Sequence, residues 1–211
     1  MEIRPTGWFP RVAADRGGRA RIALVILAQL TDTHVLEEGE VQFIDNNAML
    51  AEAIRSLNAE RPRPDIVLGT GDLTNWAREG QYARLAALLS ELELPFLPLV
   101  GNHDDRALMK QTFPETPWAD ADHASWVHEL DGVRLVGLDS TDPGRHGAAV
   151  DADRLAWLDA ALDTDQPTVL ALHHPPFVTG VAWMDGLGFD GLDALHEAIA
   201  GHIDAFGWCN W

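Results

Sequence analysis

Short apolar runs alternate with segments of helical spacing along most of this chain. Continuous apolar or strand-like runs predict strands over 22–30, 66–68, 94–100, 168–172 and 205–209. Apolar residues that recur every three or four positions predict helices over 45–59, 80–92, 151–162 and 192–200, and a shorter one over 107–113. The first run is apolar from 22 to 28 without interruption, which is typical of a strand buried on both faces. Together these patterns predict an α/β protein.

Two further segments complete the predicted organisation. Asp131-Gly132 separates the runs 125–130 and 133–138, and Asp-Gly between two alternating runs predicts a hairpin with a two-residue turn. Residues 180–191 are rich in glycine and carry no sustained period, so a loop is predicted there.

Polar side chains follow four of the predicted strands directly. The chemistry-bearing residues at these strand ends are Asp32, His34, Asp72, Asn102, His103 and His173. An α/β protein gathers its site at the carboxyl ends of its strands, so we expect these side chains to lie together.

Carboxylate and imidazole side chains at this spacing predict a metal site. On an extended chain Asp32 and His34 share a direction and chelate one ion. Asp72 then bridges to a second ion, which Asn102 and His173 complete. Mixed oxygen and nitrogen ligands suit manganese, iron or zinc better than magnesium.

His103 remains free in this scheme to protonate a leaving alkoxide. A purely structural interpretation of these residues also stays open, because a single aspartate at a strand end is more often a helix N-cap than a metal ligand. His174 is expected to pack or to bond backbone, and four histidines are assigned no role: His123, His128, His146 and His196. Caps, turns or an acidic rim are expected for Asp104, Asp105, Asp139 and Asp142.

The amino-acid composition limits the classes of partner that the chain is expected to bind. The chain has 211 residues, of which 46% are hydrophobic, enough for one sizeable core. A formal net charge of -18 argues against nucleic-acid polymers and anionic membranes as partners, and it repels phosphates unless bound cations reverse the local field. The lone Cys209 fits a reducing cytoplasm, and no apolar stretch has the length of a membrane helix. We expect a flexible arm over 1–20 and a single domain over 21–211.

These motifs resemble those of the calcineurin-like metallophosphoesterases. The matching segments are Asp32-x-His34, Gly71-Asp72, Gly101-Asn102-His103-Asp104, His173-His174-Pro175-Pro176 and Met184-Asp185. The last two are closest to class III cyclic-nucleotide phosphodiesterases and related glycerophosphodiesterases. The resemblance implies a four-layer α/β/β/α sandwich of two mixed sheets and a dinuclear site. It also implies that Asp32 and His34 bind the first metal, that Asp72 bridges, that Asn102 and His173 bind the second, and that His103 is the catalytic acid.

The chain departs from the family at one motif. The family's Gly-His-x-His is absent, and Gly201-His202-Ile203-Asp204 matches only its first half, about 29 residues after His173. We prefer the alignment in which Trp208-Cys209 belongs to the strand that leads into the missing motif, so His202 becomes a loop residue. The domain is then expected to be truncated at its C-terminus, with weakened metal binding.

The sequence therefore predicts a metal-dependent phosphodiesterase with two divalent ions of manganese, iron or zinc. The expected substrate is a small phosphodiester such as a cyclic nucleotide or a glycerophosphodiester. Two alternative functions stay open: a degenerate, non-catalytic family member, and a phosphomonoesterase or pyrophosphatase on the same fold. A homodimer also stays open as the oligomeric state.

Overall fold

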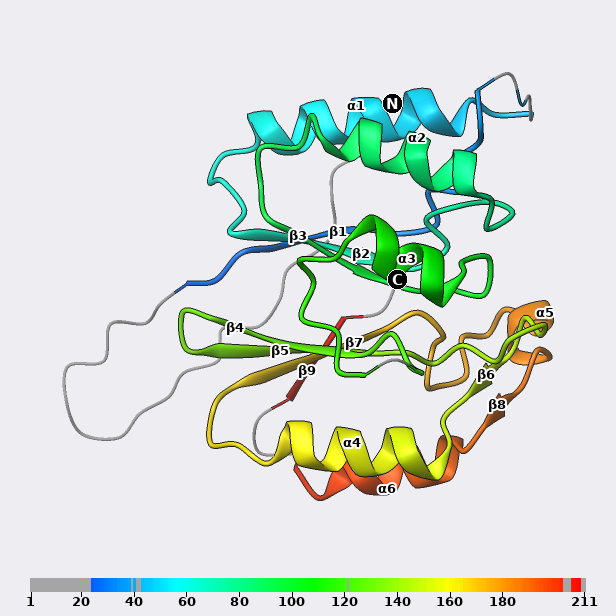
Figure 1. Ribbon diagram of the computed structural model, residues 1–211. Coiled ribbons are helices and arrows are strands. Elements are labelled where there is room, and N and C mark those ends of the chain that lie inside the picture. Colours follow the sequence, from blue (N-terminus) through cyan, green and yellow to red (C-terminus); the bar gives the residue numbers. More distant parts are fainter. Residues whose placement is uncertain (1–23, 39, 41–42, 121, 203–205, 210–211) are drawn as a thin grey trace.

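Two β-sheets face each other, and helices cover the outer side of each (Figure 1). The structure is a computed structural model and describes residues 24–38, 40, 43–120, 122–202 and 206–209. The order of layers is α/β/β/α, which confirms the predicted four-layer fold, although only one of the two sheets is mixed among the described strands. The expected arm over 1–20 lies outside the described residues.

The first sheet consists of β1 (Leu27–Leu30), β2 (Ile66–Thr70) and β3 (Phe96–Leu99), in that order and all parallel. The central strand β2 is buried along its whole length. The prediction of a strand buried on both faces over 22–28 is wrong for the described part of that run. The strand β1 begins only at Leu27, and it is half-buried. Among the described strands it pairs with β2 alone, at the edge of the sheet.

Two helices, α1 (Asn46–Ala59) and α2 (Glu79–Leu89), lie on the outer side of this sheet (Figure 1), while α3 (Arg106–Thr112) contacts α2 and adds Met109 to the apolar layer beneath these helices. The side chain of Asp45 caps α1 by accepting from the Ala48 amide, and Asp105 caps α3 in the same way. Asp105 is thus a cap, as the structural interpretation predicted.

The second sheet has the order β4-β5-β7-β9 and is mixed. Its strands are β4 (Trp126–Leu130), β5 (Val133–Leu138), β7 (Thr168–Leu172) and β9 (Phe206–Cys209), and only β4 and β5 are antiparallel. The predicted hairpin is confirmed: Asp131 and Gly132 have φ of 47° and 86°, and two positive φ angles are the requirement of a type I′ turn.

Helices α4 (Ala152–Leu162) and α6 (Leu192–Ala200) cover the outer side of the second sheet (Figure 1). The predicted loop over 180–191 is only partly irregular, since it contains the short helix α5 (Ala182–Asp185) and the strand β8 (Phe189–Asp190). β8 pairs in parallel with β6 (Ala148–Ala149). Elements of two to four residues are too short to leave a periodic signal.

Apolar side chains form three core layers, as a four-layer sandwich requires. One layer lies under α1 and α2, a second lies between the sheets, and a third lies under α4 and α6. Trp126 is fully buried in the middle layer and its indole donates to the Pro98 carbonyl at 2.7 Å. This bond ties the second sheet to the edge strand β3 of the first. No helix among the described residues is long and apolar enough to cross a membrane.

Candidate metal centre

The carboxyl ends of β1, β2, β3 and β7 meet at one edge of the sandwich. β1, β2 and β3 are parallel, so their ends necessarily share an edge. β7 belongs to the other sheet, and His173 at its end donates from Nδ1 to the Thr70 carbonyl at 2.9 Å. Every residue predicted from the strand ends lines the same cavity of about 800 Å³: Asp32, His34, Asp72, Asn102, His103 and His173.

Asp72 lies at the centre of this cluster. Its Oδ1 is 3.4 Å from His173 Nε2 and its Oδ2 is 3.7 Å from His34 Nε2. The backbone amide of His103 donates to Oδ1 at 2.8 Å. Each carboxylate oxygen therefore faces a different imidazole, which is the orientation that a bridging carboxylate needs.

Two groups of side chains place their ligand atoms within 4.8 Å of one another in the described part of the chain. One is His34, Asp72 and His103, and the other is Asp32, Asp72 and His173. Asp72 belongs to both groups. His34 Nε2 also lies 3.9 Å from Asp32, so the pairing of these two residues predicted from sequence is close in space as well.

His173 and His103 are oriented as metal-binding histidines usually are, whereas His34 Nδ1 has no hydrogen-bond partner among the described residues. His173 and His103 each bond a backbone carbonyl through Nδ1, that of Thr70 and of Asn75 respectively, both at 2.9 Å. A carbonyl only accepts, so Nδ1 carries a proton, and it is Nε2 whose lone pair a metal would bind in the neutral ring. The donor set of carboxylates and imidazoles thus fits manganese, iron or zinc.

Asn102 is oriented by a histidine to which the sequence assigned no role. The Asn102 amide nitrogen lies 3.0 Å from His146 Nδ1. An amide nitrogen only donates, so the amide oxygen stays available as a neutral ligand. The His146 ring is also 5.5 Å from the His103 ring.

The backbone is strained at the site. Asp32, His34 and Asp72 have φ of 51°, 41° and 50°, in the left-handed region that non-glycine residues rarely occupy. Sequence reasoning assumed an extended chain between Asp32 and His34, and this is wrong. The segment turns while the amides of Asp32 and His34 donate to the carbonyls of Gly71 and Asp72. Strain of this kind persists where hydrogen bonds over-determine the backbone, and it clusters at functional sites.

Two glycines permit the close packing of the cluster. A Cβ at Gly71 would lie 2.5 Å from His173 Nδ1, and a Cβ at Gly101 would lie 2.2 Å from Asp72 Oδ1. Any larger residue at either position would displace one of the predicted ligands.

Burial and neighbouring charges set the pKa values of the cluster. Burial opposes the charge of Asp72, but the hydrogen bond and charge of His173 outweigh it and hold the pKa of Asp72 well below its usual range. Burial also opposes the charge of His173, but Asp72 raises the pKa of His173 to about 9. Burial lowers the pKa of His34. In the absence of metal, the proton on His173 is therefore the positive charge that balances Asp72.

His174 and His146 are cavity residues that the sequence analysis did not assign to the site. His174 is buried, its Nδ1 lies 2.8 Å from Ser140 Oγ, and its Nε2 has no partner among the described residues. Burial lowers the pKa of His174 to about 4. The His-His-Pro-Pro motif pointed to His174, whereas no sequence signal distinguished His146 from a surface histidine.

The remaining acidic residues have structural partners. Asp104 accepts from the amides of Leu73, Thr74 and Gly101, which holds the β2 and β3 ends together. Asp139 is fully buried and pairs with Arg106. It is neither a rim residue nor exposed, so that part of the structural interpretation is wrong for Asp139.

His202 lies away from the cluster. Its Nε2 is 3.1 Å from Asp159 on α4, and it belongs to neither ligand group. This agrees with its assignment as a loop residue.

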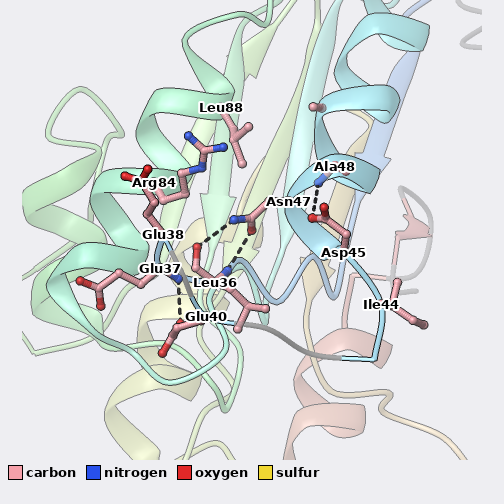
Figure 2. A pocket seen from close by; sticks show the side chains of 11 residues that line it. Leu36, Glu37, Glu38, Glu40, Ile44, Asp45, Asn47, Ala48, Arg84 and Leu88 are labelled. Atoms are coloured by element: carbon pink, nitrogen blue, oxygen red, sulfur yellow. Dashed lines mark hydrogen bonds between the residues drawn. The ribbon is translucent and has the colours of Figure 1, made fainter.

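A second cavity lies beside α1 and α2 and is acidic (Figure 2). Its lining includes Glu37, Glu38, Glu40 and Asp45, and Arg84 of α2 also lines it. Neither ligand group lies there, within the residues that the structure describes.

The geometry agrees with what comparison with known proteins shows. A family model described as calcineurin-like phosphoesterase matches residues 26–203. The chain belongs to the calcineurin-like phosphoesterase family. This range contains every residue of the two candidate ligand groups.

Curated relatives in this phosphoesterase family are diesterases by name. The chain is 32% identical over 166 residues to the "Probable glycerophosphodiester phosphodiesterase GpdQ" of Arcobacter nitrofigilis, covering 76% of this chain and 61% of that protein. It is 35% identical over 178 residues to the "Probable cyclic nucleotide phosphodiesterase RPA0124" of Rhodopseudomonas palustris, covering 81% and 65%. The chain thus spans less than two thirds of the length of these relatives.

A solved structure with a similar fold is the purple acid phosphatase PPD1 of yellow lupin (Lupinus luteus). Its TM-score is 0.56 at 14% identity, and the match covers 78% of this chain and 33% of that one. This similarity supports the fold and nothing further.

Proposed function

We propose that this phosphoesterase-family chain is a metal-dependent phosphodiesterase that acts on small phosphodiesters through a dinuclear site. The observation that carries the proposal is the position of Asp72, which belongs to both ligand groups and directs one oxygen to each of two histidines. The names of the curated relatives, glycerophosphodiester and cyclic nucleotide phosphodiesterases, support a diester substrate.

The residues that would hold the metals are the predicted ones: Asp32, His34, Asp72, Asn102 and His173. Two divalent ions bound there would supply Lewis-acid polarisation of a phosphoryl oxygen and a water nucleophile that is active at neutral pH. Asp72 offsets the repulsion between two cations, and His146 fixes the amide of Asn102.

His103 is the proton donor in this proposal. Its Nδ1–H is held on the Asn75 carbonyl, so in the doubly protonated ring the proton for the departing alkoxide would come from Nε2. His103 also belongs to one ligand group, so its role has to be separated from metal binding by experiment.

The test combines metal content with a substrate panel. Purified protein is titrated with manganese, iron and zinc, and hydrolysis of bis-p-nitrophenyl phosphate is compared with that of p-nitrophenyl phosphate. We expect low activity without added metal, a rise with manganese and faster hydrolysis of the diester. Asp72→Asn should lose metal and nearly all activity.

Three outcomes would contradict the proposal. A faster reaction with the monoester would support a phosphomonoesterase, and no turnover with any of the three metals would support a non-catalytic protein. Equal metal content in Asp72→Asn and the parent chain would remove the bridging role.

A further inference from the structure

The cavity that holds the metal cluster has a second wall, made of apolar side chains. This wall comes from the segment after β7, which includes α5 and β8. We define the apolar wall by the cavity residues Phe177, Val178, Trp183, Leu187 and Leu192. The metal cluster and the wall share one cavity of about 800 Å³, which has room for a phosphate and an organic group together.

Several of these side chains are unusually exposed for apolar residues. Trp183 is 70% exposed, Phe177 is 52% exposed and Val178 is 85% exposed. Scattered apolar residues on a surface are normal, but a contiguous group beside a polar centre marks a binding surface. The wall is therefore a candidate subsite rather than part of the core.

Hydrogen bonds hold the wall in place. Asp185 accepts from the Thr179 amide and hydroxyl, both at 2.8 Å, and from the Gly180 amide at 3.1 Å. His196 lies 2.6 Å from the Pro176 carbonyl, and β8 pairs with β6. The exposed side chains thus extend from a fixed backbone, which reduces the entropic cost of binding.

The charge of the cavity limits its ligand. The described residues that line the cavity include no lysine or arginine, while Asp32, Asp72 and Asp185 are acidic. Apart from bound cations and the histidines, no described lining residue would neutralise a second or third negative charge on a ligand. A monoanionic diester with an uncharged organic group fits this lining better than a dianionic monoester or a pyrophosphate.

We propose that the apolar wall binds the organic ester group of a phosphodiester and selects aromatic or apolar groups over glycerol and other polyols. Aromatic rings bury apolar area against Trp183 and Phe177, whereas polyol hydroxyls lose water there without gaining partners. This proposal rests on the proposed phosphodiesterase function and names its substrate class.

The test measures binding separately from turnover. Methyl phenyl phosphate and glyceryl methyl phosphate are both monoanions and differ in one ester group. Their dissociation constants are measured by ligand-detected NMR on the full chain loaded with zinc. We expect the phenyl ligand to bind about tenfold more tightly, the effect of burying on the order of 50 Å² of apolar area.

Variants of the wall identify the residues responsible. Trp183→Ala and Phe177→Ala should each reduce the preference to about threefold or less, leaving the affinity for the glyceryl ligand unchanged. Trp183→Phe should retain the preference. Phe43→Ala is the matched control, since Phe43 is fully exposed and lies outside the cavity.

Equal affinities for the two ligands, no measurable binding of either, or an equal loss for both in Trp183→Ala would overturn the proposal. These results are distinct from failure of the proposed function. A chain that prefers the phenyl ligand but hydrolyses no diester would refute only the function, and a chain that hydrolyses diesters without the preference would refute only the apolar subsite.

Discussion

Gly101→Ala is the substitution whose effect the structure defines most directly. Gly101 follows β3, and its amide donates to Asp104 at 3.0 Å. A Cβ at this position would lie 2.2 Å from Asp72 Oδ1 and 2.3 Å from the Asp72 backbone nitrogen. Since the clash involves backbone as well as side chain, a change of the Asp72 rotamer alone cannot relieve it.

The size of the effect follows from these distances. Non-bonded heavy atoms prefer separations of about 3.5 Å, so Asp72 or the turn at Gly101 must move by on the order of 1 Å. A misplacement of about 1 Å at a catalytic centre costs on the order of 100-fold in rate. Overpacking of a rigid site costs roughly 1–3 kcal/mol of unfolding free energy. We therefore expect a folded protein with weakened metal binding and about 100-fold lower diesterase activity.

Three measurements check this expectation: bound metal by elemental analysis, hydrolysis of bis-p-nitrophenyl phosphate with saturating manganese, and urea denaturation. Gly201→Ala is the matched control. Gly201 has φ of -64° and ψ of -17° at the end of α6, and among the described residues a Cβ there would meet the Ala198 carbonyl alone, at 3.5 Å. Full metal content and a rate within twofold of the parent in Gly101→Ala would refute the reasoning that close packing positions Asp72.

Three further predictions follow from the site and its support. His103→Ala should keep its metal yet lose about 10²–10⁴-fold in rate on a diester with a poor leaving group, and less with nitrophenolate; loss of bound metal would identify His103 as a ligand. Zinc affinity should fall as pH falls below the pKa of His173, about 9 without metal, because the ion displaces a proton; titrations across pH measure this, and a flat profile contradicts it. The stability of the metal-free protein should change with pH in the opposite direction from zinc affinity. The pKa of His173 lies above the ordinary 6.5, so protonated His173 stabilises the fold at lower pH, and this stabilisation is lost as pH rises through about 9. Arg106→Leu leaves the carboxylate of Asp139 buried without its cation and should cost about 3 kcal/mol in urea denaturation. Arg55→Leu, which breaks an exposed pair, should cost under about 1 kcal/mol, and equal losses in the two variants would contradict the burial argument.

Local sequence determined the longer elements and which side chains make up the candidate ligand groups. Asp131-Gly132 defined a two-residue turn because both positions need positive φ, and the structure has it. The strand ends predicted Asp32, Asp72 and His173 as neighbours, because parallel strands present their carboxyl ends at one edge. These inferences depend on periodicity and chain direction, which are properties of short segments.

The tertiary structure alone decided the features that depend on distant segments. His146 is a cavity residue only because the chain after β5 returns to Asn102, 44 positions away in sequence. The left-handed backbone at Asp32 and His34 is held by hydrogen bonds to the segment after β2. The residue types at these two positions do not by themselves predict it. The apolar wall is part of the site because Trp183 and its neighbours line the same cavity as the residues at the strand ends. Such contacts join residues far apart in sequence, so packing between the two sheets, rather than local preference, determines them.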